Sequence, residues 1–447
     1  MRRSLPLCLA VVLGVGACGS TPEPGTLEIT VMGQPPPTDA AGRKWFAGKV
    51  AAFEAANPGI RIKPTESSFW DARSFAARLA AGNVETVIRV PLTEPGALIA
   101  RGQVADISAE AKALPGWAAF DPKVLEPVTR DGKVFGIPEN MYALGISYNR
   151  ELFAKAGLDP DRPPSTWDEL RAAARQVKER TGAIGFGATT TKNAGGWHLS
   201  AATYSFGGTM ERVGAGPPSV AFTDGPTERY LNLLKQMRWT DGSMGTQQLR
   251  SQDDMNRDFA AGRVAIAINA PDYYPVYAQN YQGDPAKFGM AALPQAGGDA
   301  TLVGGTVDLV SAKATREQRA AAVKWIDFSY LRVVADPGAA AEYARSRAAD
   351  GLAVGVPVLP LFDQSTLDRV NAAIAPYVNV PGERFRPFLD GTRKLRYLAE
   401  PPVAAQELYA VLDSTVQAVL TKPDADPHGL LVEAASRVAP ILRRPNS

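Results

Sequence analysis

Aromatic and hydrogen-bonding side chains come directly after three stretches near the N-terminus in which apolar and polar residues alternate as they do in strands. Together these side chains supply an amide, two rings, a hydroxyl and a carboxylate. In α/β domains, ligands bind outside the carboxyl ends of strands. We therefore expect these loops to hold binding residues, and the candidates are Gln34, Phe69, Trp70, Thr93 and Glu94.

A second set of rings and polar groups lies in the middle of the chain. Rings can cover the C–H faces of a sugar, and polar groups can pair its hydroxyls, because a buried unpaired hydroxyl costs about 1 to 3 kcal/mol. The candidate rings are Trp197, Tyr273 and Tyr274. The candidate hydrogen-bonding groups are Asn193, His198, Asn269 and Asp272.

Few residues suited to catalysis are present. The chain has two histidines, His198 and His428, and both of its cysteines lie in the N-terminal segment. These counts exclude a multi-histidine metal site and a thiolate mechanism in the folded part. Two enzymatic alternatives stay open: a serine triad through His198, without a Gly-x-Ser-x-Gly turn, and a carboxylate pair of Glu94 and Asp272 for glycoside hydrolysis. We expect a protein that is not an enzyme, with no catalytic residue, no cofactor and no metal.

Strand-like and helix-like segments alternate along the chain, which is typical of an α/β fold. The alternating stretch 27–31 is followed by apolar residues at helical spacing up to the break at 57–59, and another strand-like stretch comes next. Capping boxes at Thr166–Glu169 and Thr315–Gln318 predict two helix starts. The order of segments does not divide at one linker, so it favours two discontinuous lobes.

The first residues have the form of an export signal. Arg2 and Arg3 precede a short apolar run that is too short to span a membrane stably. Residues 15–19, Val-Gly-Ala-Cys-Gly, then resemble the lipobox of bacterial lipoproteins. The resemblance implies a signal peptide at 1–17, acylation of Cys18, including a palmitate, and a tether at 18–25. We expect an exported protein that is anchored to the outer face of the cell membrane.

The charge balance disfavours polyanionic partners. Without Arg2 and Arg3, the 48 basic residues fall to 46, which equals the number of acidic ones. A formally neutral chain has no electrostatic reason to bind nucleic acid. We expect a monomer whose membrane contact is made through the lipid anchor.

Several ordered segments resemble the family 1 extracellular solute-binding proteins, which include maltose-binding and other sugar-binding receptors of ABC importers. The order of these segments is more specific than any one of them. The Asn269–Asp272 loop is also similar to a loop of the family in which an aromatic ring often stacks on the ligand; here Asp272 takes the ring's place and Tyr273 is its substitute. The matching segments are 53–60, 132–138, 146–153, 163–170, 259–266 and 304–306.

The resemblance implies a type II fold of two α/β lobes that close on a ligand about a hinge. It implies a first lobe at 26–138 plus 295–345 and a second at 139–294 plus 346–442, with crossings near 136–140, 293–298 and 344–351. Contacts from residues 352–401 cannot be assigned. Four further candidates follow from the implied crossings and from the glycine pair: Tyr142, Gly304, Gly305 and Thr306.

The function that this resemblance implies is capture of a carbohydrate, a disaccharide or an oligosaccharide, for delivery to the permease subunits of an ABC transporter. Another small polar solute, such as a glycerophosphodiester or a polyol, is the alternative within the binding class. A phosphate group would require basic residues in the selected loops, and only Arg89 and Lys192 are present there.

Overall fold

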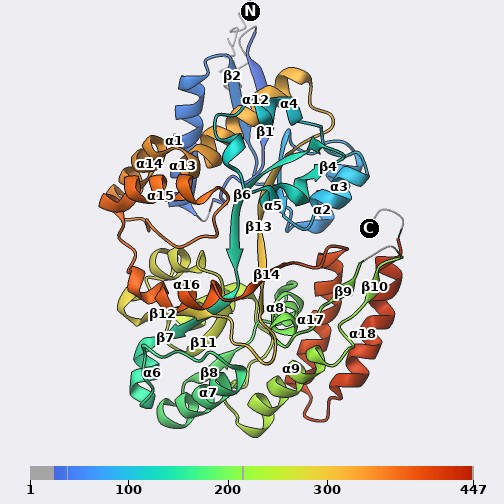
Figure 1. The fold of residues 1–447 in the computed structure, drawn as a ribbon, viewed down its shortest axis with the longest axis vertical. Helices are drawn as coiled ribbons and strands as arrows, with labels where there is room; N and C mark the ends of the chain where they lie inside the picture. Colours follow the sequence, from blue (N-terminus) through green and yellow to red (C-terminus); the bar gives the residue numbers. More distant parts are fainter. Residues whose placement is uncertain (1–24, 38, 214–215, 445–447) are drawn as a thin grey trace, which may run out of the picture.

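The computed structural model describes residues 25–37, 39–213 and 216–444. Cys18, the signal segment and nearly all of the tether lie outside these residues. Two α/β lobes are connected by strands β6 (Gly136–Ala143) and β13 (Ala300–Val310), which run from one lobe to the other (Figure 1). The two-lobe α/β fold is confirmed. Within the described residues, no helix is long and apolar enough to cross a membrane.

The first lobe is built on a six-stranded mixed sheet in the order β14-β13-β3-β1-β2, with β6 also paired to β13. β1 is parallel to β2 and β3, whereas β13 is antiparallel to β3 and β6. The alternation in the sequence points Ile29 and Val31 of β1 into the core, where both are fully buried. The remaining strand bounds are β1 (Leu27–Val31), β2 (Ile60–Pro64), β3 (Val87–Pro91) and β14 (Arg396–Ala399).

Helices cover both faces of this sheet. The first helix, α1, begins after Asp39, whose side chain accepts a hydrogen bond from the Gly42 backbone N–H. Phe53 of this helix packs edge-to-face on Trp325, with the ring centroids 5.3 Å apart. The helix bounds are α1 (Ala40–Ala56), α2 (Ala72–Ala80), α3 (Pro95–Ala100), α4 (Ser108–Lys112), α5 (Pro122–Leu125), α12 (Arg316–Ile326), α13 (Arg332–Ala335), α14 (Pro337–Ala349) and α15 (Gln364–Ile374).

The second lobe is built on a four-stranded sheet in the order β12-β7-β11-β8. All six residues of its strand β11 are buried, as expected for a continuous apolar strand covered on both faces. The strand bounds are β7 (Gly145–Asn149), β8 (Ile184–Gly187), β11 (Val264–Asn269) and β12 (Phe288–Ala292). The helix bounds are α6 (Arg150–Ala156), α7 (Trp167–Thr181), α8 (Ala194–Ser205), α9 (Pro226–Lys235), α10 (Gln252–Ala260), α11 (Tyr273–Pro275), α16 (Arg386–Thr392), α17 (Ala405–Thr421) and α18 (Pro427–Leu442).

Two short hairpins complete the fold, one in each lobe. They are β4 (Thr129–Arg130) with β5 (Lys133–Val134), and β9 (Glu211–Arg212) with β10 (Ser219–Val220).

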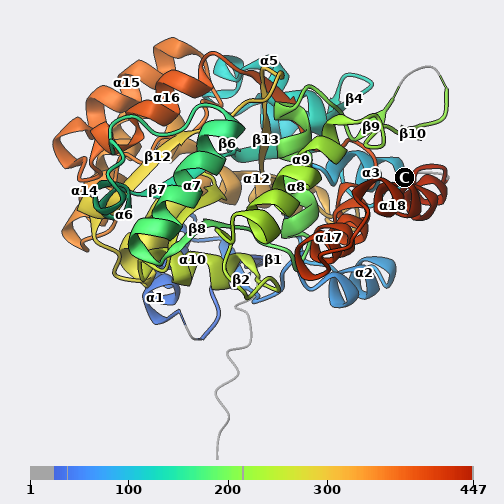
Figure 2. The same ribbon diagram turned by 90° about the horizontal axis from the view of Figure 1, so that it is seen from below.

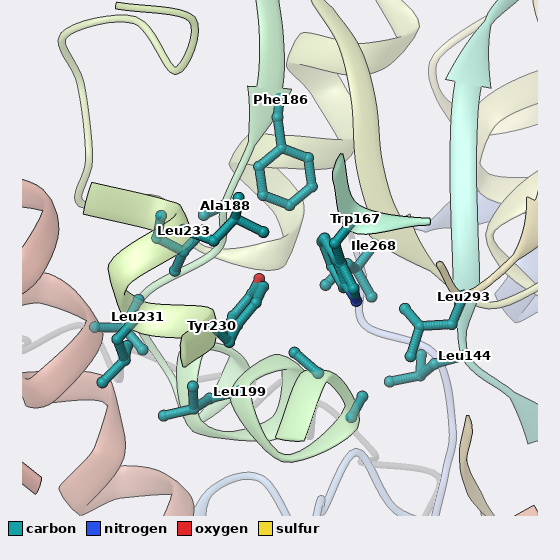
Figure 3. Close-up of a cluster of buried hydrophobic side chains, with 14 of the residues drawn as sticks. Leu144, Trp167, Phe186, Ala188, Leu199, Tyr230, Leu231, Leu233, Ile268 and Leu293 are labelled. Atoms are coloured by element: carbon teal, nitrogen blue, oxygen red, sulfur yellow. The ribbon is translucent and has the colours of Figure 1, made fainter. Parts of the chain in front are cut away.

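Trp167 anchors the core of the second lobe (Figure 3). Its ring meets Tyr230 edge-to-face at 4.9 Å, and its Nε1 donates to Ser205 Oγ at 2.8 Å. The ring therefore fills the core while its one polar atom stays paired. The capping boxes at Thr166–Glu169 and Thr315–Gln318 are both confirmed.

The positions at which the chain crosses between the lobes differ in part from the expected ones. β6 begins at the first expected crossing, whereas the second crossing follows β13 itself rather than the preceding segment 293–298. At the expected third crossing, α14 continues to Ala349, and α15 packs on α13 and α14. Figure 2 shows α14 and α15 on the opposite side of the molecule from α17 and α18. We propose that the first lobe extends to about residue 377.

Candidate functional site

Gly304 lies in crossing strand β13, directly opposite Tyr142 of crossing strand β6. A Cβ atom at Gly304 would come within 2.5 Å of both the Tyr142 hydroxyl and Glu400 Oε1. The missing side chain therefore lets these two polar atoms lie close to the backbone of β13. We call Gly304 and the side chains around it, Tyr142, Glu400, Trp197 and Glu94, the Gly304 junction.

Glu400 comes directly after strand β14, which pairs in parallel with the first half of β13. Its side chain is 7% exposed, and its Oε2 accepts a hydrogen bond of 2.9 Å from the Tyr409 hydroxyl of α17. Burial raises the pKa of Glu400 to about 7, and the nearby Glu94 raises it further. The hydrogen bond from Tyr409 holds this carboxyl in one place. Because its pKa is near 7, it is present in both protonated and ionised forms at neutral pH, so it can either donate or accept a hydrogen bond.

Glu94 brings a carboxylate of the first lobe to the same place. It occupies the N-cap position of α3, but its side chain makes no capping hydrogen bond. Instead, its Oε1 accepts from the Thr93 hydroxyl at 3.2 Å. Burial raises the pKa of Glu94 to about 7, Glu407 on α17 adds to the rise, and Arg101 opposes it. Glu94 therefore faces acidic groups that come from the C-terminal part of the chain.

Two rings form the aromatic part of the junction. Tyr142 and Trp197 meet edge-to-face at 6.0 Å, and both side chains are half-buried. The Trp197 Nε1 is buried and makes no hydrogen bond within the described residues. A buried indole N–H without an acceptor costs free energy, and a ligand oxygen placed beside it would remove that cost.

Asp272 lies on the second lobe, close enough to Tyr142 to raise the pKa of that hydroxyl. The Asp272 side chain is exposed, yet the surrounding protein raises the pKa of its carboxyl by burial. Asp272 therefore brings a second-lobe carboxylate near the Tyr142 hydroxyl of the junction.

The side chains of four other predicted site residues make hydrogen bonds within the second lobe. Asn269 pairs with Gln252 and Ser147, and the Tyr273 hydroxyl donates to the Asn256 carbonyl from a ring that is 5% exposed. The Asn193 amide donates to Gln406 from a backbone with φ of 70°.

His198 is the fourth of these residues. Its Nδ1 is 2.7 Å from the Thr189 hydroxyl, and its Nε2 is buried without a partner beside a small cavity. Burial lowers the pKa of His198 to about 3, so its imidazole is neutral near pH 7.

The remaining candidates lie in the first lobe or on β13. Phe69 meets Trp70 edge-to-face at 5.3 Å and also contacts Phe75, and the Trp70 side chain is 67% exposed. The Gln34 backbone N–H donates to the Thr65 carbonyl. Gly305 and Thr306 follow Gly304 in β13, where they pair with Met141 and Asn140. The structure thus brings Glu94, Thr93, Tyr142, Trp197 and Gly304 together and leaves Gln34, Phe69 and Trp70 on the first lobe.

Sequence reasoning missed Glu400 and Tyr409. Glu400 lies in the stretch 352–401, in which no contact residue was assigned, and β14 has only four residues with no alternation of buried and exposed positions. Tyr409 lies within helix α17, where a buried tyrosine has no sequence pattern that separates it from an ordinary core residue. In the part of the chain that the structure describes, no group of three or more acidic, histidine or cysteine residues is placed to hold a metal ion.

Comparison with known proteins gives one matching family model and many similar folds. The family of bacterial extracellular solute-binding proteins matches residues 49–339. A relative from Brucella abortus, named only as a binding protein, is 27% identical over 334 residues, which cover 72% of this chain and 75% of the relative. The sn-glycerol-3-phosphate-binding periplasmic protein UgpB of Escherichia coli is 29% identical over 134 residues, or 28% of this chain and 30% of that protein.

Solved structures show the same fold at low sequence identity. An ABC transporter solute-binding protein from Thermotoga lettingae, bound with alpha-D-tagatose, has a TM-score of 0.73 and 21% identity and covers 93% of this chain and 99% of its own. The GacH receptor of Streptomyces glaucescens, solved unliganded and with acarbose, has a TM-score of 0.73 and 19% identity, with 93% and 98% covered. UgpB from Mycobacterium tuberculosis in complex with glycerophosphocholine has a TM-score of 0.71 and 18% identity, with 94% and 99% covered.

Proposed function

The chain belongs to the bacterial extracellular solute-binding proteins, and on this premise we propose that it captures a carbohydrate between its lobes and delivers it to an ABC importer. The observation that carries this proposal is the Gly304 junction. There, the half-buried rings of Tyr142 and Trp197 lie beside the Glu400 carboxyl and an indole N–H without an acceptor. Flat rings next to fixed polar groups match the C–H faces and hydroxyls of a sugar.

Capture works by closure of the lobes. Glu94 belongs to the first lobe, whereas Trp197 belongs to the second. A ligand that contacts both side chains at once binds the closed form more tightly than the open form, so it shifts the population toward closure. The crossing strands β6 and β13 carry the hinge, as in other two-lobe binding proteins.

The protein acts as a monomeric receptor and not as an enzyme. Family members bind solutes. Incubation of the purified protein with the glycosides it binds should release no sugar product, as measured by chromatography. Turnover would support the glycosidase alternative, in which the raised pKa of Glu94 would suit a general acid.

The proposed function is tested by a thermal-shift screen over mono- and oligosaccharides, because a ligand at 100 times its Kd stabilises a protein by about 2.7 kcal/mol. We expect Trp197→Ala to lower the affinity for the best sugar by about 10- to 100-fold, since stacking and a hydrogen bond each contribute about 1 kcal/mol. Each tenfold loss removes about 1.4 kcal/mol of ligand stabilisation.

Trp239→Phe is the matched control for this variant. The Trp239 Nε1 donates to the Val419 carbonyl at 3.0 Å, within the second lobe. The control should lower the melting temperature without changing the sugar-induced shift. Equal losses of sugar affinity in both variants, or no stabilisation by any sugar, would contradict the proposal.

We further propose that lipidated Cys18 holds the receptor at the outer face of the cell membrane, beside the importer. The support is the sequence of the N-terminal segment and the extracellular location of the family. Each buried methylene contributes about 0.8 kcal/mol, so two or more acyl chains anchor stably. Cys18→Ser should move the protein from the membrane fraction to the soluble fraction on cell fractionation and immunoblotting, and an unchanged distribution would contradict the anchor.

A further inference from the structure

Glu94 and Glu400 are carboxylates of the Gly304 junction itself, and two further carboxylates lie near its members, Glu407 near Glu94 and Asp272 near Tyr142. Glu94 follows β3, Asp272 follows β11, and Glu400 and Glu407 lie on either side of the start of α17. Glu94 raises the pKa of Glu400, and Glu407 raises the pKa of Glu94. Both Glu400 and Asp272 raise the pKa of Tyr142. These effects place Glu94 near both Glu400 and Glu407, and place Glu400 and Asp272 near Tyr142.

Positive charge is almost absent around these carboxylates. In the described part of the chain, Arg101 is the one cation close enough to lower the pKa of Glu94, and no cation lowers that of Glu400 or Asp272. The Arg101 side chain is exposed, and its Nε donates to the Ala97 carbonyl of its own helix. Buried carboxylates in proteins usually have a paired cation. Here the protein supplies none for Glu400.

Two further features indicate that a ligand completes the site. Glu400 is nine-tenths buried, and its hydrogen bond with Tyr409 uses Oε2, whereas Oε1 lies 2.5 Å from the position that a Cβ of Gly304 would take. The Trp197 Nε1 is also buried and unpaired, and the Tyr142 ring lies beside it. Aromatic rings next to carboxylates are the surroundings that proteins use to bind ammonium groups.

We propose that the carbohydrate captured at the Gly304 junction carries a cationic group, a protonated amine, which binds against Glu400 and Glu94 beside the rings of Tyr142 and Trp197. The carbohydrate part of this inference rests on the function proposed above, whereas the cationic part rests on the charges at the junction. An ammonium placed there forms charge-assisted hydrogen bonds with groups that otherwise repel one another. A phosphate or carboxylate would be repelled by the same groups.

The probes are sets of disaccharides that share one linkage and differ in one substituent, which is a hydroxyl, an amine, an N-acetyl group or a carboxylate. Affinities are measured by isothermal titration calorimetry with the full chain. The amine should bind at least about 10-fold more tightly than the hydroxyl and N-acetyl forms, because hydrogen bonds between charged groups are about twice as strong as neutral ones.

The pH dependence has a definite sign. Without ligand, the pKa values of Glu94 and Glu400 are about 7, so both carboxyls are largely protonated at about pH 5.5. A bound cation favours the ionised form, so binding of the amine should release protons, and its affinity should rise between about pH 5.5 and pH 7.5. The charged groups that face Glu94, besides Glu400, are Glu407 and Arg101, and the hydroxyls that face Glu400 are those of Tyr142, Tyr204 and Tyr409. Affinity for the uncharged sugar should change little over this range.

Glu400→Gln and Glu94→Gln keep the shape of each side chain and remove its charge. Each should lower the affinity for the amine form about 10-fold more than the affinity for the hydroxyl form, so that the preference for the amine falls by about 10-fold. Glu211→Gln is the control, since burial raises the pKa of Glu211 to about 7 as well, but its carboxylate accepts from the Val403 amide. That variant should keep the full preference. Glu94 makes no capping hydrogen bond to α3, so Glu94→Gln removes no bond that holds the helix. This variant therefore still tests the preference for the amine if Glu400→Gln folds poorly.

The outcomes separate the two proposals. Equal affinity for the amine and hydroxyl forms, without proton release, would overturn the cationic ligand and leave carbohydrate binding intact. Binding of choline or spermidine and of no disaccharide would overturn carbohydrate binding and support the cationic ligand. Tightest binding of the carboxylate form, or no binding of any probe, would overturn the cationic ligand.

Discussion

Replacing Gly304 by alanine is expected to lower carbohydrate affinity by about 100-fold while leaving the protein folded. The added methyl would meet the Tyr142 hydroxyl and Glu400 Oε1, both at 2.5 Å. Both atoms are the far ends of side chains, so the protein relieves the overlap by moving them, at a cost of about 1 to 3 kcal/mol in stability. The side chains that would be displaced are the ones proposed to hold the ligand. Calorimetric titration together with thermal melting measures both effects.

The neighbouring Gly305 provides a contrast within the same strand. A methyl at Gly305 would overlap the backbone carbonyl of Asn140 on β6, which cannot move without breaking the pairing of β6 and β13. Gly305→Ala should therefore destabilise the fold more than Gly304→Ala does. Gly48→Ala serves as a neutral control, because a methyl there, in helix α1, meets open space. Sugar affinity that stays unchanged in a folded Gly304→Ala protein would show that the ligand binds elsewhere.

Much of the fold could be predicted because its signals are local. Strand β1, with its alternation of exposed and buried residues, and the helix starts at Thr166 and Thr315 were predicted at the right positions. Capping boxes depend on side chains three residues apart, and a buried strand such as β11 is recognised by its continuous apolar run. None of these signals depends on distant parts of the chain.

The candidate site was harder to predict because it depends on pairings that are distant in sequence. Glu400 reaches Gly304 only because β14 pairs with β13, about 95 residues earlier, and the four residues of β14 have no distinctive pattern. Loop position also did not reveal which polar groups are already paired. Asn269 follows a strand as a ligand-binding residue would, but its amide is used by Gln252 and Ser147.

Arg89 is the centre of a buried charge cluster between β3 and the crossing strands β6 and β13, which was not predicted from the sequence. Its Nη2 lies 2.8 Å from Glu139 Oε2 on β6, and its Nε lies 3.3 Å from Asp308 Oδ1 on β13. Its guanidinium also lies over the ring of Tyr330 at 4.1 Å, and Lys49 Nζ lies over the same ring at 4.4 Å. A charged residue within an apolar strand, as in Val87–Val90, was the available signal. Its partners lie on strands that are distant in sequence.

Replacing Arg89 by methionine is expected to lower the free energy of unfolding by about 3 to 5 kcal/mol at pH 8, because it leaves two buried carboxylates without their main counter-ion. Asp308 is 1% exposed and Glu139 18%. Lys49 compensates in part, since the loss of the nearby arginine removes a repulsion that helps to lower its pKa. Denaturant unfolding monitored by circular dichroism gives the difference.

The loss of unfolding free energy in the Arg89→Met protein should become smaller at low pH, because protonation removes the unpaired charges. A loss caused by missing packing would not depend on pH in this way. Burial already raises the pKa values of Glu139 and Asp308, and Arg89 opposes that rise. Without Arg89 both carboxyls bind protons more readily in the folded state than in the unfolded state, so stability is retained at low pH and lost as pH rises through the folded pKa. The variant should therefore recover stability between about pH 8 and pH 5 relative to the wild type.

Arg396→Met breaks an ion pair with Asp299 whose two side chains are more than 60% exposed, and it should cost less than about 1 kcal/mol at either pH. A deficit in the Arg89 variant that is the same at both pH values would mean that the guanidinium stabilises the hinge by packing on Tyr330 rather than by its charge.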